Sequence, residues 1–189
     1  MTARSAPSDV GLDQAGFRRV LGRFCTGVTV VSGMDGAVPV GFTCQSFSAL
    51  SLDPPLVLCC PSRSSRTWPL LARSGAFCVN VLAREQQDVS AVFGRGGADK
   101  FAGVRWHPAP SGSPVLEGVL AWIDCAVEAV HEAGDHYVVV GRVRALGESG
   151  DEAPLLFYRG AYAAVERART TRAEGLEGFL TWPCHDDWM

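Results

Sequence analysis

Two runs of small polar residues carry the groups that could bind a cofactor. Residues 41–47 read Gly-Phe-Thr-Cys-Gln-Ser-Phe at the end of a predicted strand, and their N–H groups and hydroxyls suit the edge of a flat heterocycle. Residues 62–67 combine three serines, a threonine and two arginines before a predicted helix, a combination that favours a phosphate. From composition alone, both runs could equally be ordinary loops.

Other catalytic patterns do not occur in the sequence. The glycine-rich residues 94–97 follow a predicted helix, whereas a dinucleotide-binding fingerprint follows a strand. There is no Walker A motif and no Gly-x-Ser-x-Gly elbow, and the four histidines have no ligand spacing. Cys184 and His185 are adjacent but lack a second pair of donors, so we expect no metal site.

Composition and charge narrow the class of protein. The chain has 189 residues, of which 47% are hydrophobic, and a formal net charge of -3. That length and hydrophobicity can bury the core of one domain, and the scattered basic residues argue against nucleic acid as a partner. Seven cysteines, most of them in apolar runs, indicate reduced thiols in the core. With no signal peptide and no long apolar stretch, we expect a cytoplasmic protein that does not enter a membrane.

Three helices and a series of strands are predicted around the polar runs. Asp13 is a candidate N-cap for an amphipathic helix, because Phe17, Val20, Leu21 and Phe24 follow with helical spacing. Thr67 is a candidate N-cap for a short helix with Pro69 in its first turn, and residues 84–93 form a further predicted helix. The predicted strands are residues 28–32, 38–43, 46–50, 56–60, 76–82, 119–131, 136–146, 155–158 and 161–166, with tight turns at 35–36 and 134–135.

The short turns between these strands favour an antiparallel sheet closed or partly closed on itself. We therefore expect a mainly β protein with flanking helices. Residues 1–12 are predicted to be a flexible segment and residues 13–166 the domain. Residues 167–189, with Trp182 and Trp188, are predicted to be a tail that lies on the barrel or on a partner subunit.

Several landmarks in this order resemble the flavin reductase domain family, the small reductase components of two-component flavin-dependent monooxygenases. They are residues 43–47 (Thr-Cys-Gln-Ser-Phe), 51–55 (Ser-Leu-Asp-Pro-Pro), the loop before Thr67, 77–82 (Phe-Cys-Val-Asn-Val-Leu), Lys100-Phe101, 134–136 (Gly-Asp-His) and 156–160 (Leu-Phe-Tyr-Arg-Gly). The resemblance covers residues 17–166. It implies an antiparallel Greek-key split β-barrel that binds flavin, usually as a homodimer.

The resemblance also implies roles for particular residues. Those expected at the isoalloxazine ring are Thr43, Cys44, Gln45 and Ser46, and those expected on the phosphate side are Ser62, Arg63, Ser64 and Thr67. Lys100 and Phe101 would flank the cofactor, and His136 would lie where the nicotinamide stacks. The turn formed by Tyr158, Arg159 and Gly160 would shape the pocket. Cys44 replaces the alanine that is commoner in the family, a nearly isosteric change.

The implied activity is an NAD(P)H:flavin oxidoreductase that supplies reduced flavin to a partner monooxygenase. Hydride transfer from nicotinamide to flavin needs stacked, shielded rings rather than a general base, so His136 is expected to act by proximity. The flavin could be FAD or FMN, and NADH is favoured over NADPH.

Two other functions remain open at this stage. The same barrel occurs in proteins that only bind flavin, and the fold does not separate them from reductases. The Gly-Asp-His landmark favours the reductase. An oxidase of the pyridoxamine-phosphate type is a weaker alternative, because its substrate-binding pattern has no match among the landmarks.

Overall fold

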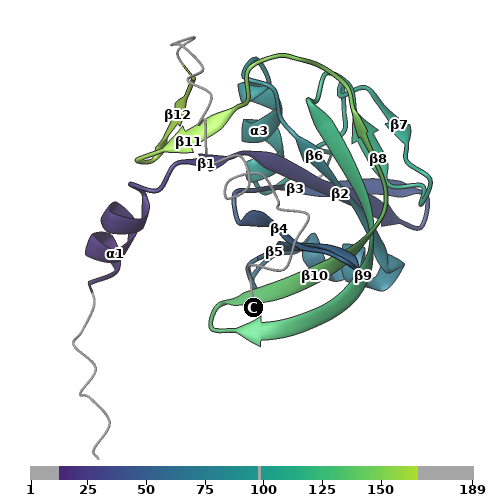
Figure 1. Cartoon of the computed structure of the whole chain (residues 1–189), viewed down its shortest axis with the longest axis horizontal. Helices are drawn as coiled ribbons and strands as arrows, with labels where there is room; N and C mark the ends of the chain where they lie inside the picture. Colours follow the sequence, from purple (N-terminus) through teal and green to yellow (C-terminus); the bar gives the residue numbers. More distant parts are fainter. Residues whose placement is uncertain (1–12, 98, 166–189) are drawn as a thin grey trace, which may run out of the picture.

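The computed structural model describes residues 13–97 and 99–165, which form three helices and twelve strands (Figure 1). The helices are α1 (Gln14–Leu21), α2 (Trp68–Ser74) and α3 (Gln87–Gly94). The strands are β1 (Thr26–Gly27), β2 (Thr29–Asp35), β3 (Val38–Cys44), β4 (Phe47–Leu52), β5 (Pro55–Cys59), β6 (Ala76–Val81), β7 (Trp106–Pro108), β8 (Pro114–Leu116), β9 (Ala121–Ala133), β10 (His136–Glu148), β11 (Leu156–Tyr158) and β12 (Ala161–Ala163).

Seven strands form one antiparallel sheet in the order β3-β2-β6-β9-β10-β5-β4. The two edge strands, β3 and β4, are consecutive in the chain and joined only by Gln45 and Ser46. Because so short a link spans only about 10 Å, the sheet must curl until its edges approach each other. The edges meet without pairing, which is the split-barrel arrangement, and the predicted fold class is confirmed.

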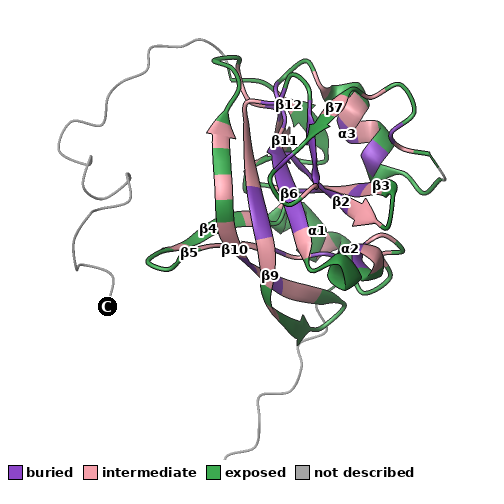
Figure 2. Ribbon diagram, turned by 90° about the vertical axis from the view of Figure 1, so that its right-hand side faces the viewer, coloured by how far each residue is buried: buried purple, intermediate pink, exposed green. Residues whose placement is uncertain are grey.

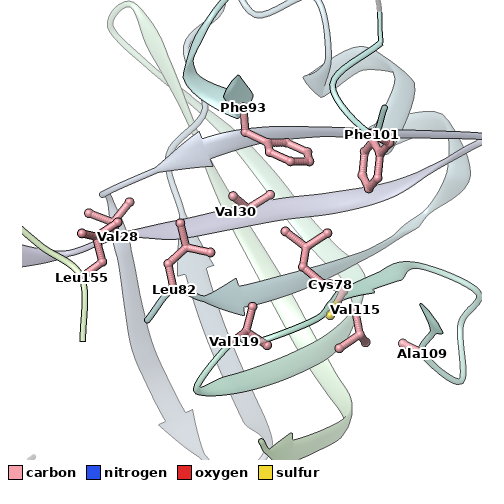
Figure 3. Packing of buried hydrophobic residues seen from close by; sticks show 11 residues of the cluster. Val28, Val30, Cys78, Leu82, Phe93, Phe101, Ala109, Val115, Val119 and Leu155 are labelled. Carbon is pink, nitrogen blue, oxygen red and sulfur yellow. The ribbon is translucent and has the colours of Figure 1, made fainter. Parts of the chain in front are cut away.

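The central strands of this sheet are buried on both faces. Successive side chains of a strand point to opposite faces, and in β2 Val30 packs in one hydrophobic cluster while Val31 packs in the other. Figure 3 shows the first cluster, in which Phe93 of α3 and Phe101 lie beside Val30. Figure 2 shows the buried stretches in the middle of the sheet and exposed strand ends around them. This two-sided packing holds β3, with its polar exit, against α3.

Most of the predicted strands are confirmed, with shifts of a few residues at their ends. In β5, Val57 and Cys59 are buried, whereas Leu56 and Leu58 on the opposite face are half-buried. The sequence pattern did not reveal β1, β7 and β8, which have two or three residues each. The helix predicted over residues 84–93 begins later, at Gln87, and its Val92 side chain is 40% exposed.

The cysteines follow the expectation of reduced thiols. Among the described residues all six are free, and Cys44, Cys59, Cys78 and Cys125 are buried. Cys25 is exposed and Cys60 is half-buried. Cys184 lies outside the described residues.

The helix α1 begins as predicted, because the Asp13 carboxylate accepts from the N–H groups of Ala15 (3.1 Å) and Gly16 (3.0 Å). Its apolar face is not covered in the single chain, since Phe17 is 51% and Val20 63% exposed, and the helix ends at Leu21, before the predicted Phe24. The helix stands apart from the sheet (Figure 1).

No helix among the described residues has the length and hydropathy to cross a membrane. The predicted segments 1–12 and 167–189 lie outside the described residues.

Candidate functional site

The link between β3 and β4 is held by its own side chains. Thr43 Oγ1 donates to the carbonyl of Ser90 in α3 at 2.7 Å. Ser46 Oγ donates to the Cys60 carbonyl at 3.1 Å and accepts from the Cys60 N–H at 3.2 Å. These hydroxyls therefore fix the backbone of the strand exit between α3 and the end of β5.

Cys44 is the buried member of this link. Its Sγ lies 3.3 Å from Ser46 Oγ, and burial raises the pKa of the thiol above its ordinary value, although the neighbouring Ser46 hydroxyl partly opposes this. The side chain is therefore a neutral thiol at neutral pH, close to the small apolar group that it replaces.

A cavity of about 370 Å³ opens beside this link, here called the strand-exit cavity. Its lining residues are Phe42, Thr43, Cys44, Gln45, Ser46, Cys60, Pro61, Ser62, Ser65 and His136. The structure thus brings the predicted isoalloxazine residues, one predicted phosphate residue and the predicted nicotinamide residue to one place, although they come from distant parts of the chain.

His136 reaches this cavity because the first residues of β10 are bound to the loop after β5. Residues Ser62 and His136 form an isolated β-bridge, and the Tyr137 N–H donates to the Pro61 carbonyl at 2.9 Å. His136 Nδ1 donates to the Asp135 carboxylate at 2.8 Å, and this hydrogen bond, reinforced by the charge of the imidazole, lowers the pKa of Asp135. The bond orients the ring and leaves Nε2 as its free nitrogen.

A second, larger cavity of about 770 Å³, here called the basic cavity, shares Phe42, Thr43 and Ser65 with the first. Its other lining residues are Ser64, Arg66, Thr67, Phe93, Gly94, Arg95, Gly96, Gly97 and Lys100. The two cavities therefore form one continuous groove, and no Asp or Glu within residues 13–97 and 99–165 lines either of them.

Lys100 anchors the wall of the basic cavity. Its Nζ donates to the carbonyls of Phe93 at 2.9 Å and Gly41 at 3.2 Å, and partial burial lowers the pKa of the ammonium group. The neighbouring Phe101 is almost fully buried and packs edge-on against Phe93, with ring centroids 4.9 Å apart. Of this predicted pair, Lys100 therefore faces the groove and Phe101 supports it from the core.

In the loop before α2, some side chains form hydrogen bonds that stabilise the loop and the helix start, and some line the groove. Ser62 Oγ and Ser64 Oγ are 2.8 Å apart, and Ser65 Oγ accepts from the Trp68 N–H at 3.1 Å. Thr67 occupies the N-cap position as predicted, but its side chain makes no capping hydrogen bond. Ser65, which we did not single out, supplies that bond and lines both cavities.

Arg63 does not line either cavity. Its guanidinium lies 3.3 Å from the Glu132 carboxylate and 5.9 Å from the centroid of the Tyr137 ring. Arg66, three residues later, lines the basic cavity instead. The two arginines of one polar run therefore point to different surroundings.

The predicted turn of Tyr158, Arg159 and Gly160 connects β11 to β12 and lies beside α1, away from the groove. The Arg159 N–H donates to the Gly22 carbonyl at 2.8 Å, and none of the three residues lines either cavity. The hairpin touches the site indirectly, because Tyr162 donates its hydroxyl proton to Ser90 Oγ at 3.0 Å.

The glycine-rich residues 94–97 were also missed as part of the site. They fail the context of a dinucleotide fingerprint, yet they line the basic cavity. A signal was present, since glycines with no side chain let a ligand approach the backbone closely. What the sequence lacked was the position of this segment opposite the loop before α2.

Comparisons with known proteins agree with this geometry. The family model described as "Flavin reductase like domain" matches residues 21–166. The flavin-dependent monooxygenase reductase subunit HsaB of Rhodococcus jostii is 53% identical over 192 residues, covering 100% of this chain and 98% of that protein.

Two solved structures are similar over most of the chain. Nitrilotriacetate monooxygenase component B from Mycobacterium thermoresistibile has a TM-score of 0.82 and 53% identity, covering 89% of this chain and 97% of that one. The NADH:FAD oxidoreductase SgcE6 of Streptomyces globisporus, in complex with NAD and FAD fragments, has a TM-score of 0.78 and 34% identity, covering 82% and 94%.

Proposed function

This chain belongs to the flavin reductase like domain family, and we propose that it oxidises NADH, reduces FAD or FMN and supplies the reduced flavin to a partner monooxygenase. The relatives described above are named as the reductase subunit of a monooxygenase, as component B of a monooxygenase, and as an NADH:FAD oxidoreductase. These names support the electron donor, the acceptor and the class of partner.

The continuity of the groove is the observation that carries the proposal. The strand-exit cavity offers the backbone of residues 43–46 and the His136 ring, and the basic cavity continues from it with hydroxyls and cations. A flavin nucleotide has this same order of groups, a flat heterocycle followed by a phosphate. The residues present therefore fit the group, and the described part of the chain brings arginines and a lysine but no carboxylate to the groove, which fits the negative charge of the phosphate.

In this proposal each part of the groove has a separate task. The strand exit, held by Thr43 and Ser46, presents its N–H groups to the heterocycle, and Ser62, Ser64 and Thr67 hold the phosphate side. Lys100 keeps the wall of the basic cavity in place, with Phe101 packed behind it.

His136, oriented by Asp135, positions the nicotinamide over the strand exit. The flavin, when bound, supplies the hydride acceptor. The chain's contribution is to hold the two rings within reach and to exclude water.

A homodimer belongs to the same proposal. The exposed apolar face of α1 and the exposed Tyr158 lie on one side of the chain, and a patch of that kind marks an interaction surface. In a dimer, the turn of Tyr158, Arg159 and Gly160 would meet the partner subunit, and Arg63 would keep its ion pair on the groove's outer side. Light scattering coupled to size exclusion would test this, and a monomer at micromolar concentration would contradict it.

Loss of absorbance at 340 nm tests the activity directly. The purified protein is given NADH or NADPH, with riboflavin, FMN or FAD as acceptor. We expect rapid oxidation of NADH that requires added flavin, and slower oxidation of NADPH. Tight binding of flavin without oxidation of either nucleotide would contradict the reductase and leave a protein that only binds flavin.

A further inference from the structure

We infer that Arg66 and Arg95 make the groove selective for a flavin dinucleotide, because together they bind its second phosphate. The inference rests on the proposed function, in which the groove takes a flavin. It goes further by assigning the basic cavity to the part of FAD that FMN lacks.

The size and position of the two cavities separate the parts of the ligand. Ser62 lines only the strand-exit cavity, Ser64 only the basic cavity, and Ser65 lines both. A phosphate bound by these hydroxyls therefore lies where the cavities join. FMN ends at that point, yet the basic cavity, with a total volume of about 770 Å³, continues past it toward Arg66 and Arg95. A cavity of this size is large enough for a second phosphate and a nucleoside.

The charges in the basic cavity are available to a ligand. Among the described residues, Arg66 and Arg95 have no ion pair, whereas Arg63 and Arg73 are paired with Glu132 and Asp35. Arg66 lies before α2 and Arg95 after α3, so the two arginines line the cavity from separate segments. Guanidinium groups bind phosphate oxygens with two parallel hydrogen bonds.

Lys100 is a weaker candidate for this role. Its ammonium group has three donors, and two of them are already bound to the carbonyls of Phe93 and Gly41. Its charge raises the potential of the cavity, but its position is set by the protein.

The glycines of the basic cavity leave room for the nucleoside. A Cβ atom added at Gly96 or Gly97 would meet nothing within 4 Å, and one at Gly94 would meet only Thr43, at 3.8 Å. The wall next to Arg95 is therefore open backbone rather than side chain, and a planar base can approach it closely.

The experiment measures dissociation constants of riboflavin, FMN and FAD by quenching of flavin fluorescence. For the unmodified chain we expect FAD to bind more tightly than FMN. Arg66→Ala and Arg95→Ala should each weaken FAD binding about 10-fold, as expected for loss of a charge-assisted hydrogen bond, and should change FMN less and riboflavin not at all. Arg95→Lys should recover only part of the loss, because lysine cannot make two parallel bonds.

Arg73→Ala is the matched control, since Arg73 is an exposed arginine paired with Asp35 and lines neither cavity. Equal affinity for FAD and FMN in the unmodified chain would overturn the inference, and this test does not depend on any variant folding. Equal losses for FMN and FAD in the variants would also overturn it, because the arginines would then bind the first phosphate. If riboflavin binds and NADH is oxidised in those cases, the proposed function stands while the inference fails.

Discussion

At the strand-exit cavity, the hydroxyls of Thr43 and Ser46 donate to the backbone carbonyls of Ser90 and Cys60. At the basic cavity, Arg66 and Arg95 are exposed, and their side chains make no hydrogen bond to the described residues. The first region is shaped by strands packed on both faces. The second is formed by two loops that contribute charge. The difference indicates that the packed region sets the shape available to the ring and the loops set which nucleotide is preferred.

The largest effect on stability is expected at Gly41, where the packing of β3 against α3 supports both the strand-exit cavity and the basic cavity. A Cβ atom at Gly41 would lie 2.8 Å from Cε1 of the buried Phe93 ring and 3.1 Å from the Val31 carbonyl. Gly41→Ala should therefore lower the free energy of unfolding by about 1–3 kcal/mol, measured by urea denaturation. Gly27→Ala is the control, because its Cβ would meet nothing within 4 Å. Equal free energies of unfolding for Gly41→Ala and Gly27→Ala would show that the residues around Gly41 can shift to accommodate an added methyl group.

Ser46→Ala tests whether the strand exit acts on every flavin alike. Loss of the two hydrogen bonds to Cys60, each worth about 1 kcal/mol, loosens the link between β3 and β4. Affinities for riboflavin, FMN and FAD should fall by one common factor of up to about 10, measured by fluorescence quenching. Ser48→Ala serves as the control, since the Ser48 hydroxyl, among the described residues, bonds only to the neighbouring Ala49 carbonyl. A loss of affinity confined to FAD would contradict the view that the strand-exit cavity binds the ring common to all flavins and that only the basic cavity distinguishes FAD.

His136→Ala should separate the nicotinamide from the flavin. A stacked aromatic pair contributes about 0.5–1.5 kcal/mol, so kcat/KM for NADH should fall roughly 2- to 10-fold while the dissociation constants of the flavins stay unchanged. Steady-state kinetics at 340 nm provide the measurement. His131→Ala, on the exposed part of β9, is the matched control. Unchanged kinetics for His136→Ala would remove this residue from the site.

Cys44→Ala should have the smallest effect on binding, within about twofold for all flavins, because the thiol is neutral and nearly isosteric with a small apolar group. Its effect on stability depends on pH. Burial raises the pKa of the folded thiol above the ordinary value of 9.0, so the stabilisation is present below pH 9 and is lost as the pH rises toward the folded pKa. Denaturation between pH 8 and pH 10.5 should show a smaller decline for Cys44→Ala than for the unmodified chain. A steeper loss of stability for Cys44→Ala than for the unmodified chain would mean that folding lowers the pKa of the Cys44 thiol instead of raising it.

The sequence by itself determined the long strands, the helix cap at Asp13 and the turn at 134–135, and it located the first hairpin turn to within one residue, since the turn predicted at 35–36 lies at 36–37. These depend on alternation of apolar residues, on side chains within three positions of each other and on the backbone freedom of Gly36 and Gly134, which both have positive φ. The resemblance to a family then brought together His136 and the strand exit, and the structure places both at one cavity.

Only the tertiary structure decided which polar residues share a surface. Arg63 and Arg66 lie in the same polar run and cannot be told apart in the sequence. In the structure, Arg63 forms an ion pair with Glu132 of β9. Arg66 instead lines the basic cavity together with Gly94 to Gly97, which lie at the end of α3. The short strands β7 and β8 could not be predicted for a similar reason. Three residues are too few to show the alternation of apolar and polar residues that identifies a strand, and the two strands are recognised only by their pairing with each other. Local periodicity records which face of an element is apolar, whereas the direction of a loop side chain depends on the elements that pack around it.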